Sequence, residues 1–244
     1  MNNKKIKELF GTTKPIIGMI HLKGNSGKDI FRRAIREIAL LEANGIDGVM
    51  IENYFGDEYN VEEVLEYLHT IRENLVYGVN ILNDYYKSYE LADKYGASFI
   101  QIDSVAGHLP HYEDKAFGKS LELLQETSNT ILLGGVRFKY QPYLSNRSLE
   151  EDLKIGMNRC DAIVVTGAGT GKDTSLEKIN EFRNIIGDFP LIVGAGLTTD
   201  NCISKLSIAD GGIVGSYLKD NHRDNGEVSE VYTAEFMGRV KTLR

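Results

Sequence analysis

The chain has 244 residues, of which 42% are hydrophobic and 26% charged, and its formal net charge is −7. This apolar content excludes a disordered chain, and the negative charge excludes the basic stripes of a nucleic-acid-binding protein. No segment approaches the roughly 20 apolar residues of a membrane span, and the basic N-terminus lacks the apolar core of a signal peptide. We therefore expect one soluble domain over residues 1–244, in the cytoplasm.

Short apolar runs alternate with amphipathic helical stretches along the chain, which is typical of βα units around a parallel sheet. The apolar runs occupy residues 15–20, 48–51, 77–81, 98–102, 131–136, 162–165, 191–193 and 212–214. Helical periodicity is found at residues 29–44, 61–75, 86–95, 149–159, 176–186 and 200–207. Eight strands in a chain of about 250 residues predict an α/β protein with a single (β/α)8 TIM barrel. The rival architecture, a flavodoxin-like doubly wound sheet, would use five or six strands.

Polar residues gather at the ends of the first five predicted strands, which in a barrel is where the ligand site lies. In chain order they are His21, Glu52, Asn53, Asn80, Asp103, Arg137 and Lys139. Burying so many polar groups without partners would cost free energy, so the pattern predicts a binding mouth.

Roles for these residues follow from their chemistry. A carboxylate half-buried in such a mouth can have its pKa raised towards neutrality, so we expect Glu52 and Asp103 to transfer protons. Arg137 and Lys139 would stabilise developing negative charge as further catalytic residues. We expect His21, Asn53 and Asn80 to bind substrate. The alternative is that the carboxylates cap helices or form a structural network with the two basic residues.

A metal site built from His21, Glu52 and Asp103 is a second alternative, because a barrel mouth can bring such ligands together. The chain has no H-x-H or H-E-x-x-H spacing, and its other histidines are scattered, with His108 and His111 in the loop after the fourth strand. We therefore expect no metal.

Glycine-rich loops follow the last three predicted strands, and such loops let backbone N–H groups approach an anion. The expected phosphate-binding residues are Thr166, Gly167, Gly169, Thr170, Gly171, Gly194, Gly196, Gly215 and Ser216. Barrel phosphate sites often combine the loops after strands 7 and 8 with a short extra helix, which would begin near Gly215. The alternative is that these glycines only shape tight turns.

The loop after the sixth strand fits neither standard nucleotide motif. A P-loop would need Gly at position 166 and Ser or Thr at 173, where the chain has Thr166 and Asp173. A G-x-G-x-x-G motif from Gly167 would need Gly at Lys172. The sequence thus supports neither an NTPase nor a dinucleotide enzyme, and we expect no cofactor.

Tyrosine is abundant, with 13 residues against no tryptophan, and several tyrosines fall in loops on the mouth side. These are Tyr54, Tyr85, Tyr86, Tyr140 and Tyr143. They would either wall a pocket or bury a subunit contact, and we expect a homo-oligomer.

Five segments together, at residues 14–22, 47–53, 78–80, 163–171 and 193–196, resemble the BtpA/SgcQ family, and the resemblance covers nearly the whole chain. It implies a ribulose-phosphate-binding type of barrel in which the glycines after strands 6 to 8 hold a phosphate. In that family one member is named for photosystem I biogenesis, and others are associated with sugar-uptake operons and described as candidate enzymes.

The chain departs from the family pattern at the fifth strand, where Gly-Val-Arg-Phe-Lys-Tyr at 135–140 replaces a common Asp-Val-His-Val-Lys-His, and at Asp103, commonly Asn. Our leading hypothesis is an enzyme of the lyase, isomerase or glycosyl-cleaving kind, acting on a small phosphorylated sugar or related metabolite. The alternative, favoured by these departures and by the fold's many functions, is a non-catalytic assembly or regulatory factor of the photosystem I biogenesis type.

Overall fold

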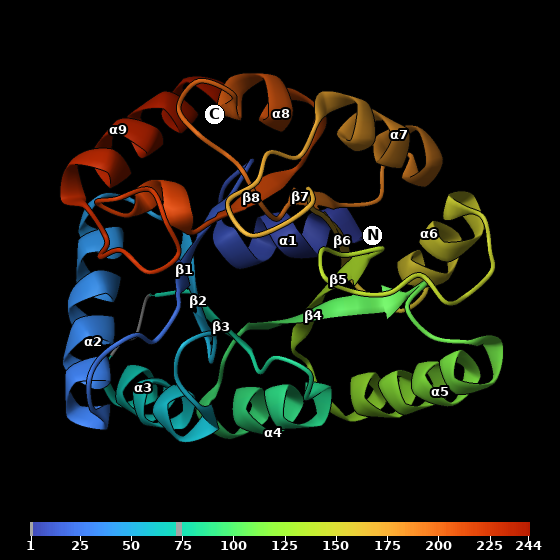
Figure 1. The fold of residues 1–244 in the computed structure, drawn as a ribbon, viewed down its shortest axis with the longest axis horizontal. Coiled ribbons are helices and arrows are strands. Elements are labelled where there is room, and N and C mark those ends of the chain that lie inside the picture. The colour runs from blue at the N-terminus through green and yellow to red at the C-terminus, as the bar shows by residue number, and fades with distance from the viewer. Residues whose placement is uncertain (1, 72–74) are drawn as a thin grey trace.

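The computed structural model describes residues 2–71 and 75–244. Its strands are parallel and close in chain order into one barrel, in which β8 pairs with β1 (Figure 1). They are β1 (Ile16–Ile20), β2 (Gly48–Glu52), β3 (Tyr77–Asn80), β4 (Phe99–Ala106), β5 (Ile131–Val136), β6 (Ala162–Val165), β7 (Leu191–Val193) and β8 (Gly211–Val214). The predicted (β/α)8 barrel is confirmed.

Helices surround the barrel (Figure 1). They are α2 (Gly27–Ala43), α3 (Glu58–Ile71), α4 (Tyr85–Tyr95), α5 (His111–Thr127), α6 (Leu149–Met157), α7 (Leu176–Ile186), α8 (Cys202–Ile208) and α9 (Glu230–Val240). Short 3-10 helices η1 (Ser216–Leu218) and η2 (Lys241–Leu243) follow β8 and α9. The helix predicted at 61–75 corresponds to α3, and positions 72–74 lie outside the described residues.

Helix α5 was not among the predicted helices. Leu121 is buried in the core, and Phe117 and Leu124, at helical spacing from it, are half-buried against the core, so α5 is amphipathic like the helices that were predicted. The structure also places His111 at the first position of this helix and not in the preceding loop, whereas His108 lies in the loop as expected.

Helix α1 (Asn2–Phe10) lies across the barrel (Figure 1). Ile6 is 2% exposed and belongs to the cluster of side chains that fills the barrel interior. The Phe10 ring lies 5.8 Å from the ring of Phe99, at the start of β4. This helix therefore covers the amino-terminal end of the barrel, opposite the carboxyl ends of the strands.

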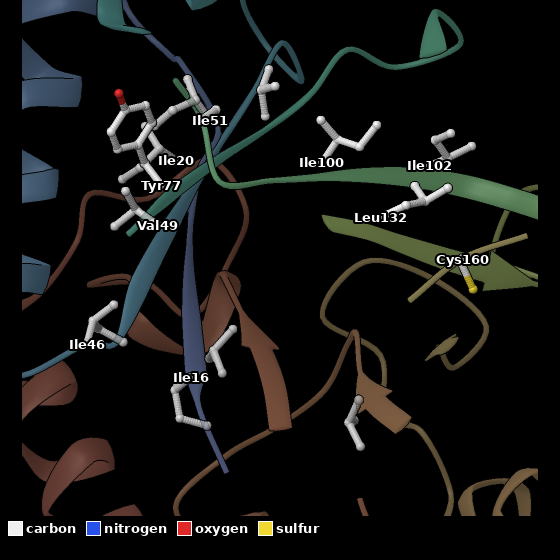
Figure 2. Close-up of a cluster of buried hydrophobic side chains, with 14 of the residues drawn as sticks. Ile16, Ile20, Ile46, Val49, Ile51, Tyr77, Ile100, Ile102, Leu132 and Cys160 are labelled. Atoms are coloured by element: carbon white, nitrogen blue, oxygen red, sulfur yellow. The ribbon is translucent and has the colours of Figure 1, made fainter. Parts of the chain in front are cut away.

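Most side chains on both faces of the strands are apolar, because one face packs against the surrounding helices and the other fills the barrel interior. In β2, Val49 and Ile51 face the outer core under the helices, whereas Met50 belongs to the interior cluster. Figure 2 shows Val49 and Ile51 in the outer core with Ile16 and Ile20 of β1. Burial of each such side chain stabilises the fold by roughly 1.5–3 kcal/mol, so the residue after Ile51 sits on a rigid support.

Strand β4 extends to Ala106, beyond the predicted end at residue 102, and contains an irregularity. Its register against β5 shifts between Ile102 and Ala106, as at a β-bulge. A Cβ atom on Gly135 of β5 would collide with the carbonyl oxygen of Asp103. Glycine at this position thus lets the displaced backbone of β4 lie against β5, and this displacement sets where Asp103 projects.

Candidate active site

A cavity of about 440 Å³ opens at the carboxyl ends of the strands. Residues from both halves of the barrel line it, among them His21, Glu52, Tyr54, Gln101, Asp103, Lys139, Thr170, Gly171, Gly194, Gly196, Gly215 and Ser216. The sequence analysis had placed the polar residues and the glycine loops at one mouth without knowing which would meet. Of the predicted residues, His21, Glu52, Asp103 and Lys139 meet the glycine-rich loops in this one cavity.

Glu52 and Asp103 lie on either side of one amide. The Asn80 Nδ2 atom donates to Glu52 Oε1 at 2.9 Å and lies 3.4 Å from Asp103 Oδ1. Gln101 Nε2 donates to the same Asp103 oxygen at 3.1 Å. Glu52 is 6% exposed and Asn80 is 2% exposed. Asn80 therefore holds the two carboxyl groups in place, with its Nδ2 atom between them.

The pKa values of both carboxyl groups are raised. Burial, reinforced by the neighbouring Asp103 carboxylate, raises the pKa of Glu52 from 4.5 to about 8, although the charge of Lys139 and the Asn80 hydrogen bond act against it. Burial also raises the pKa of Asp103. Glu52 is thus a neutral carboxylic acid at pH 7, which is the form needed for donating a proton.

His21 is neutral as well. Burial and the nearby Lys219 ammonium lower its pKa to about 3. Its Nδ1 atom lies 3.1 Å from the carbonyl oxygen of Asp224, and because a carbonyl only accepts, Nδ1 carries the hydrogen. The free lone pair on Nε2 then faces Glu52 Oε2 at 3.7 Å. This contact joins two neutral groups and is not an ion pair.

Lys139 connects the carboxyl groups to the glycine loops. Its Nζ atom donates to Thr170 Oγ1 at 3.2 Å, and its backbone N–H donates to Thr166 Oγ1 at 3.0 Å. Its charge acts on the pKa values of both Glu52 and Asp103. The ammonium thus stands where it can meet negative charge in the cavity.

The loops after β6 and β8 meet at the cavity. Gly171 has a positive φ of 67°, and a Cβ atom on it would lie 3.1 Å from Ser216 Oγ. Gly196, with φ of 73°, packs against the backbone of residues 172 and 173, and a Cβ atom on Gly215 would lie 3.1 Å from His21 Cε1. These glycines leave a bare backbone wall, and η1 begins at Ser216 as the expected short helix.

Three residues expected at the phosphate end support this loop from behind and do not line the cavity. Thr166 accepts the hydrogen bond from Lys139, Gly167 packs against the backbone of Asp173, and Gly169 packs against the hydroxyl of Tyr140.

Arg137 does not reach the cavity. It has a positive φ of 48°, and its Nε atom donates to Asp152 Oδ2 at 3.0 Å while a second nitrogen donates to the carbonyl oxygen of Arg147. Its guanidinium lies over the ring of Tyr143. Arg137 therefore pairs with Asp152 and not with Glu52 or Asp103, the carboxylates that the alternative interpretation had joined to it.

Asn53 is also structural. Its side-chain oxygen accepts a hydrogen bond from the Leu82 N–H at 2.8 Å and so fixes the loop after β3. It is not among the residues that line the cavity.

Sequence reasoning missed several residues of the cavity. Gln101 lies two positions before Asp103 on β4, so strand alternation alone places it on the same face. Tyr54 was not missed: it is one of the tyrosines expected to wall a pocket or bury a subunit contact, and it lines the cavity, where its hydroxyl donates to Asp224 Oδ2 at 3.1 Å. No sequence signal identified Asp224, because it lies in a loop far along the chain.

Neither a metal-binding cluster nor a membrane-spanning helix is found in the part of the chain that the structure describes. Among residues 2–71 and 75–244, no three His, Cys, Asp or Glu side chains lie close enough together to hold a metal ion. Within the same residues, no helix is both long and apolar enough to cross a membrane.

The model of the BtpA family matches residues 12–242 of the chain. The uncharacterized protein MJ1115 of Methanocaldococcus jannaschii is 30% identical over 88% of this chain and 90% of its own length. The photosystem I biogenesis protein BtpA of Synechocystis sp. is 26% identical over 94% of this chain and 89% of its own length.

Several solved structures share the fold. Phosphoribosyl anthranilate isomerase from Thermus thermophilus superposes with a TM-score of 0.64 at 11% identity, covering 94% of this chain and 100% of that one. A native KDPGal structure superposes with a TM-score of 0.63 at 12% identity, covering 95% of this chain and 96% of that one. At these identities the likeness shows the barrel fold alone.

Proposed function

The chain belongs to the BtpA family, and we propose that it is an enzyme that performs acid–base chemistry on a small phosphorylated sugar or related metabolite. The observation that carries the proposal is a buried, protonated Glu52 in the same cavity as the glycine loops after β6, β7 and β8. A neutral carboxylic acid held in place beside a binding wall is the arrangement that proton transfer to a bound substrate requires.

In this proposal the substrate lies with its phosphate against Gly171, Gly196 and Ser216, where glycine lets the backbone approach an anion closely. The Lys139 ammonium, at 3.2 Å from Thr170 Oγ1, lies between that wall and the carboxyl groups. It supplies the positive charge that a phosphate or a developing oxyanion needs in an otherwise acidic protein.

Glu52 is the proton donor of the proposed reaction, and Asp103 is the partner carboxyl group that accepts a proton. Asn80 fixes their separation through its two contacts. His21 is neutral, and its Nε2 atom lies 3.7 Å from Glu52 Oε2, so it adds no charge beside the proton donor. Lyase, isomerase and glycosyl-cleaving reactions all need one group that donates a proton to the substrate and one that accepts a proton from it. We therefore keep these as the proposed reaction classes.

The phosphate half of the proposal is tested by thermal unfolding with inorganic phosphate and a panel of sugar phosphates. A ligand that binds only the folded state raises the Tm, by the equivalent of about 2.7 kcal/mol at 100 times its Kd. We expect Gly215→Glu to abolish the rise, because the new side chain enters the cavity beside His21. Gly238→Glu is the matched control, since a Cβ atom there meets nothing within 4 Å. A panel without any effect, or an unchanged response of Gly215→Glu, contradicts the proposal.

A non-catalytic assembly factor is the second candidate function, and exposed aromatic residues at the rim favour it. Tyr112 is 87% exposed, Tyr140 is 72% exposed and Tyr143 is 60% exposed. Such side chains suit a protein contact, either with a second copy of the chain, as in the proposed homo-oligomer, or with a different protein. Replacing Tyr112 and Tyr143 with serine would reduce the oligomer size in light scattering if this surface joins copies of the chain.

A further inference from the structure

A second cavity of about 270 Å³ adjoins the first one at the carboxyl ends of β3 and β4. Asp103, Gln101, Asn83 and Gln141 line both cavities. Of these two cavities, only the first is lined by the glycine-rich loops that follow β6, β7 and β8. Asp103 therefore stands between a phosphate wall on one side and a separate chamber on the other.

The walls of the second cavity are largely apolar and aromatic. Ile81, Ile102 and Leu109 contribute aliphatic surface, and Phe117 of α5 contributes a ring. The Tyr85 ring meets Phe117 edge-on with a centroid distance of 5.2 Å, and the His108 ring meets it edge-on at 5.1 Å. A planar ring would pack on these apolar and aromatic side chains, and polar side chains that also line the cavity, among them Asn83 and Gln141, lie within its reach.

Two residues that line this cavity each carry a buried polar atom without a hydrogen-bond partner among the described residues. These atoms are Ser104 Oγ, on a residue only 4% exposed, and His108 Nδ1. Burial lowers the pKa of His108 to about 4, so its ring is neutral at pH 7 and offers one donor and one acceptor. Buried polar atoms are rarely left unpaired in proteins, and neither atom has a role in the chemistry assigned to Glu52 and Asp103.

We propose that this cavity is the subsite for the end of the substrate opposite its phosphate, and that this end is a planar nitrogen-containing ring whose polar edge pairs with Ser104 and His108. The inference rests on the proposed function and narrows it. The substrate would span both cavities, with its ring against the contacting Tyr85 and Phe117 side chains, its phosphate at the glycine loops and its reacting bond beside Asp103.

The test uses ring compounds without phosphate: purines, pyrimidines and pyridine carboxamides, measured by ligand-observed NMR in the presence of saturating inorganic phosphate. At least one compound is expected to bind the wild-type chain, and its affinity is expected to fall more than threefold in Ser104→Ala and in His108→Phe. Ser207→Ala is the matched control, because Ser207 is exposed on α8 and bonds only locally to Ser204. The melting temperatures of all variants report whether they fold.

Absence of binding by any compound overturns the inference, as does an affinity within threefold of wild type in either variant. Binding of inorganic phosphate is measured separately on the same samples. Phosphate binding without ring binding means that the subsite inference alone is wrong, whereas the absence of phosphate binding means that the proposed function fails.

Discussion

Glu52→Gln should make the folded protein more stable at neutral and alkaline pH. A glutamine reproduces the protonated acid: its oxygen accepts from Asn80, which donates to Glu52 Oε1 at 2.9 Å, and its amide group donates towards His21. The variant thus keeps the packing and removes the ionisable group.

The magnitude follows from the pKa of Glu52, which rises from 4.5 to about 8 on folding. Between these values the unfolded chain has lost the proton and the folded protein keeps it, so the unfolded state binds fewer protons and the free energy of unfolding falls as pH rises. At about 1.4 kcal/mol per pKa unit, the wild-type chain loses on the order of 5 kcal/mol across this range as an upper limit, because Asp103 titrates with Glu52. The Glu52→Gln variant has no such loss, because its side chain does not ionise.

Urea unfolding of both proteins between pH 5 and pH 8 measures this difference. We expect the stability advantage of Glu52→Gln to grow by several kcal/mol across the series. The contribution of His21 is common to both proteins and cancels. Glu235→Gln, at an exposed position of α9, should show no such trend. An advantage of Glu52→Gln that stays constant with pH would refute the argument that Glu52 is protonated in the folded state.

Three further predictions concern other parts of the site. The kcat/KM of a turned-over substrate should fall above about pH 8, where Glu52 loses its proton; a rate that keeps rising through pH 9 would speak against Glu52 as the acid. His21 has its pKa lowered to about 3, so the wild-type chain should lose stability as pH falls below about 6.5, and His21→Leu should weaken that loss in the same urea series. Arg137→Ala should destabilise the fold by about 3 kcal/mol, because Asp152 is fully buried beside it, and should leave phosphate binding unchanged; a variant that loses phosphate binding but not stability would place Arg137 in the site after all.

The barrel itself was predictable because the strands are marked by local patterns. Each apolar run is short and bounded by polar turns, and the side chains of β2 face a helix layer and a filled interior in turn. Such a pattern depends on neighbours in the sequence, so the sequence alone reveals it. Helix α5 carries the same kind of signal, because Phe117, Leu121 and Leu124 fall at helical spacing and pack on the core, although it was not among the predicted helices.

The site was predictable only as a set of strand ends. Glu52, Asp103 and Lys139 reach the cavity, but Arg137, two positions before Lys139, turns away because its backbone adopts a positive φ of 48° and Asp152 binds its side chain. Asn80 binds both carboxyl groups through its Nδ2 atom and lines the second cavity, not the first. These outcomes depend on contacts between residues distant in sequence, which no local pattern encodes.

The most direct test of acid–base chemistry on a phosphorylated substrate is 31P NMR of a mixture of sugar phosphates and phosphoribosyl compounds incubated with the protein at pH 7. We predict that the wild-type chain shifts or removes the resonance of at least one compound and that Glu52→Gln, folded and at equal concentration, changes none. A mixture left unaltered by the wild-type chain, or altered equally by Glu52→Gln, would contradict the account.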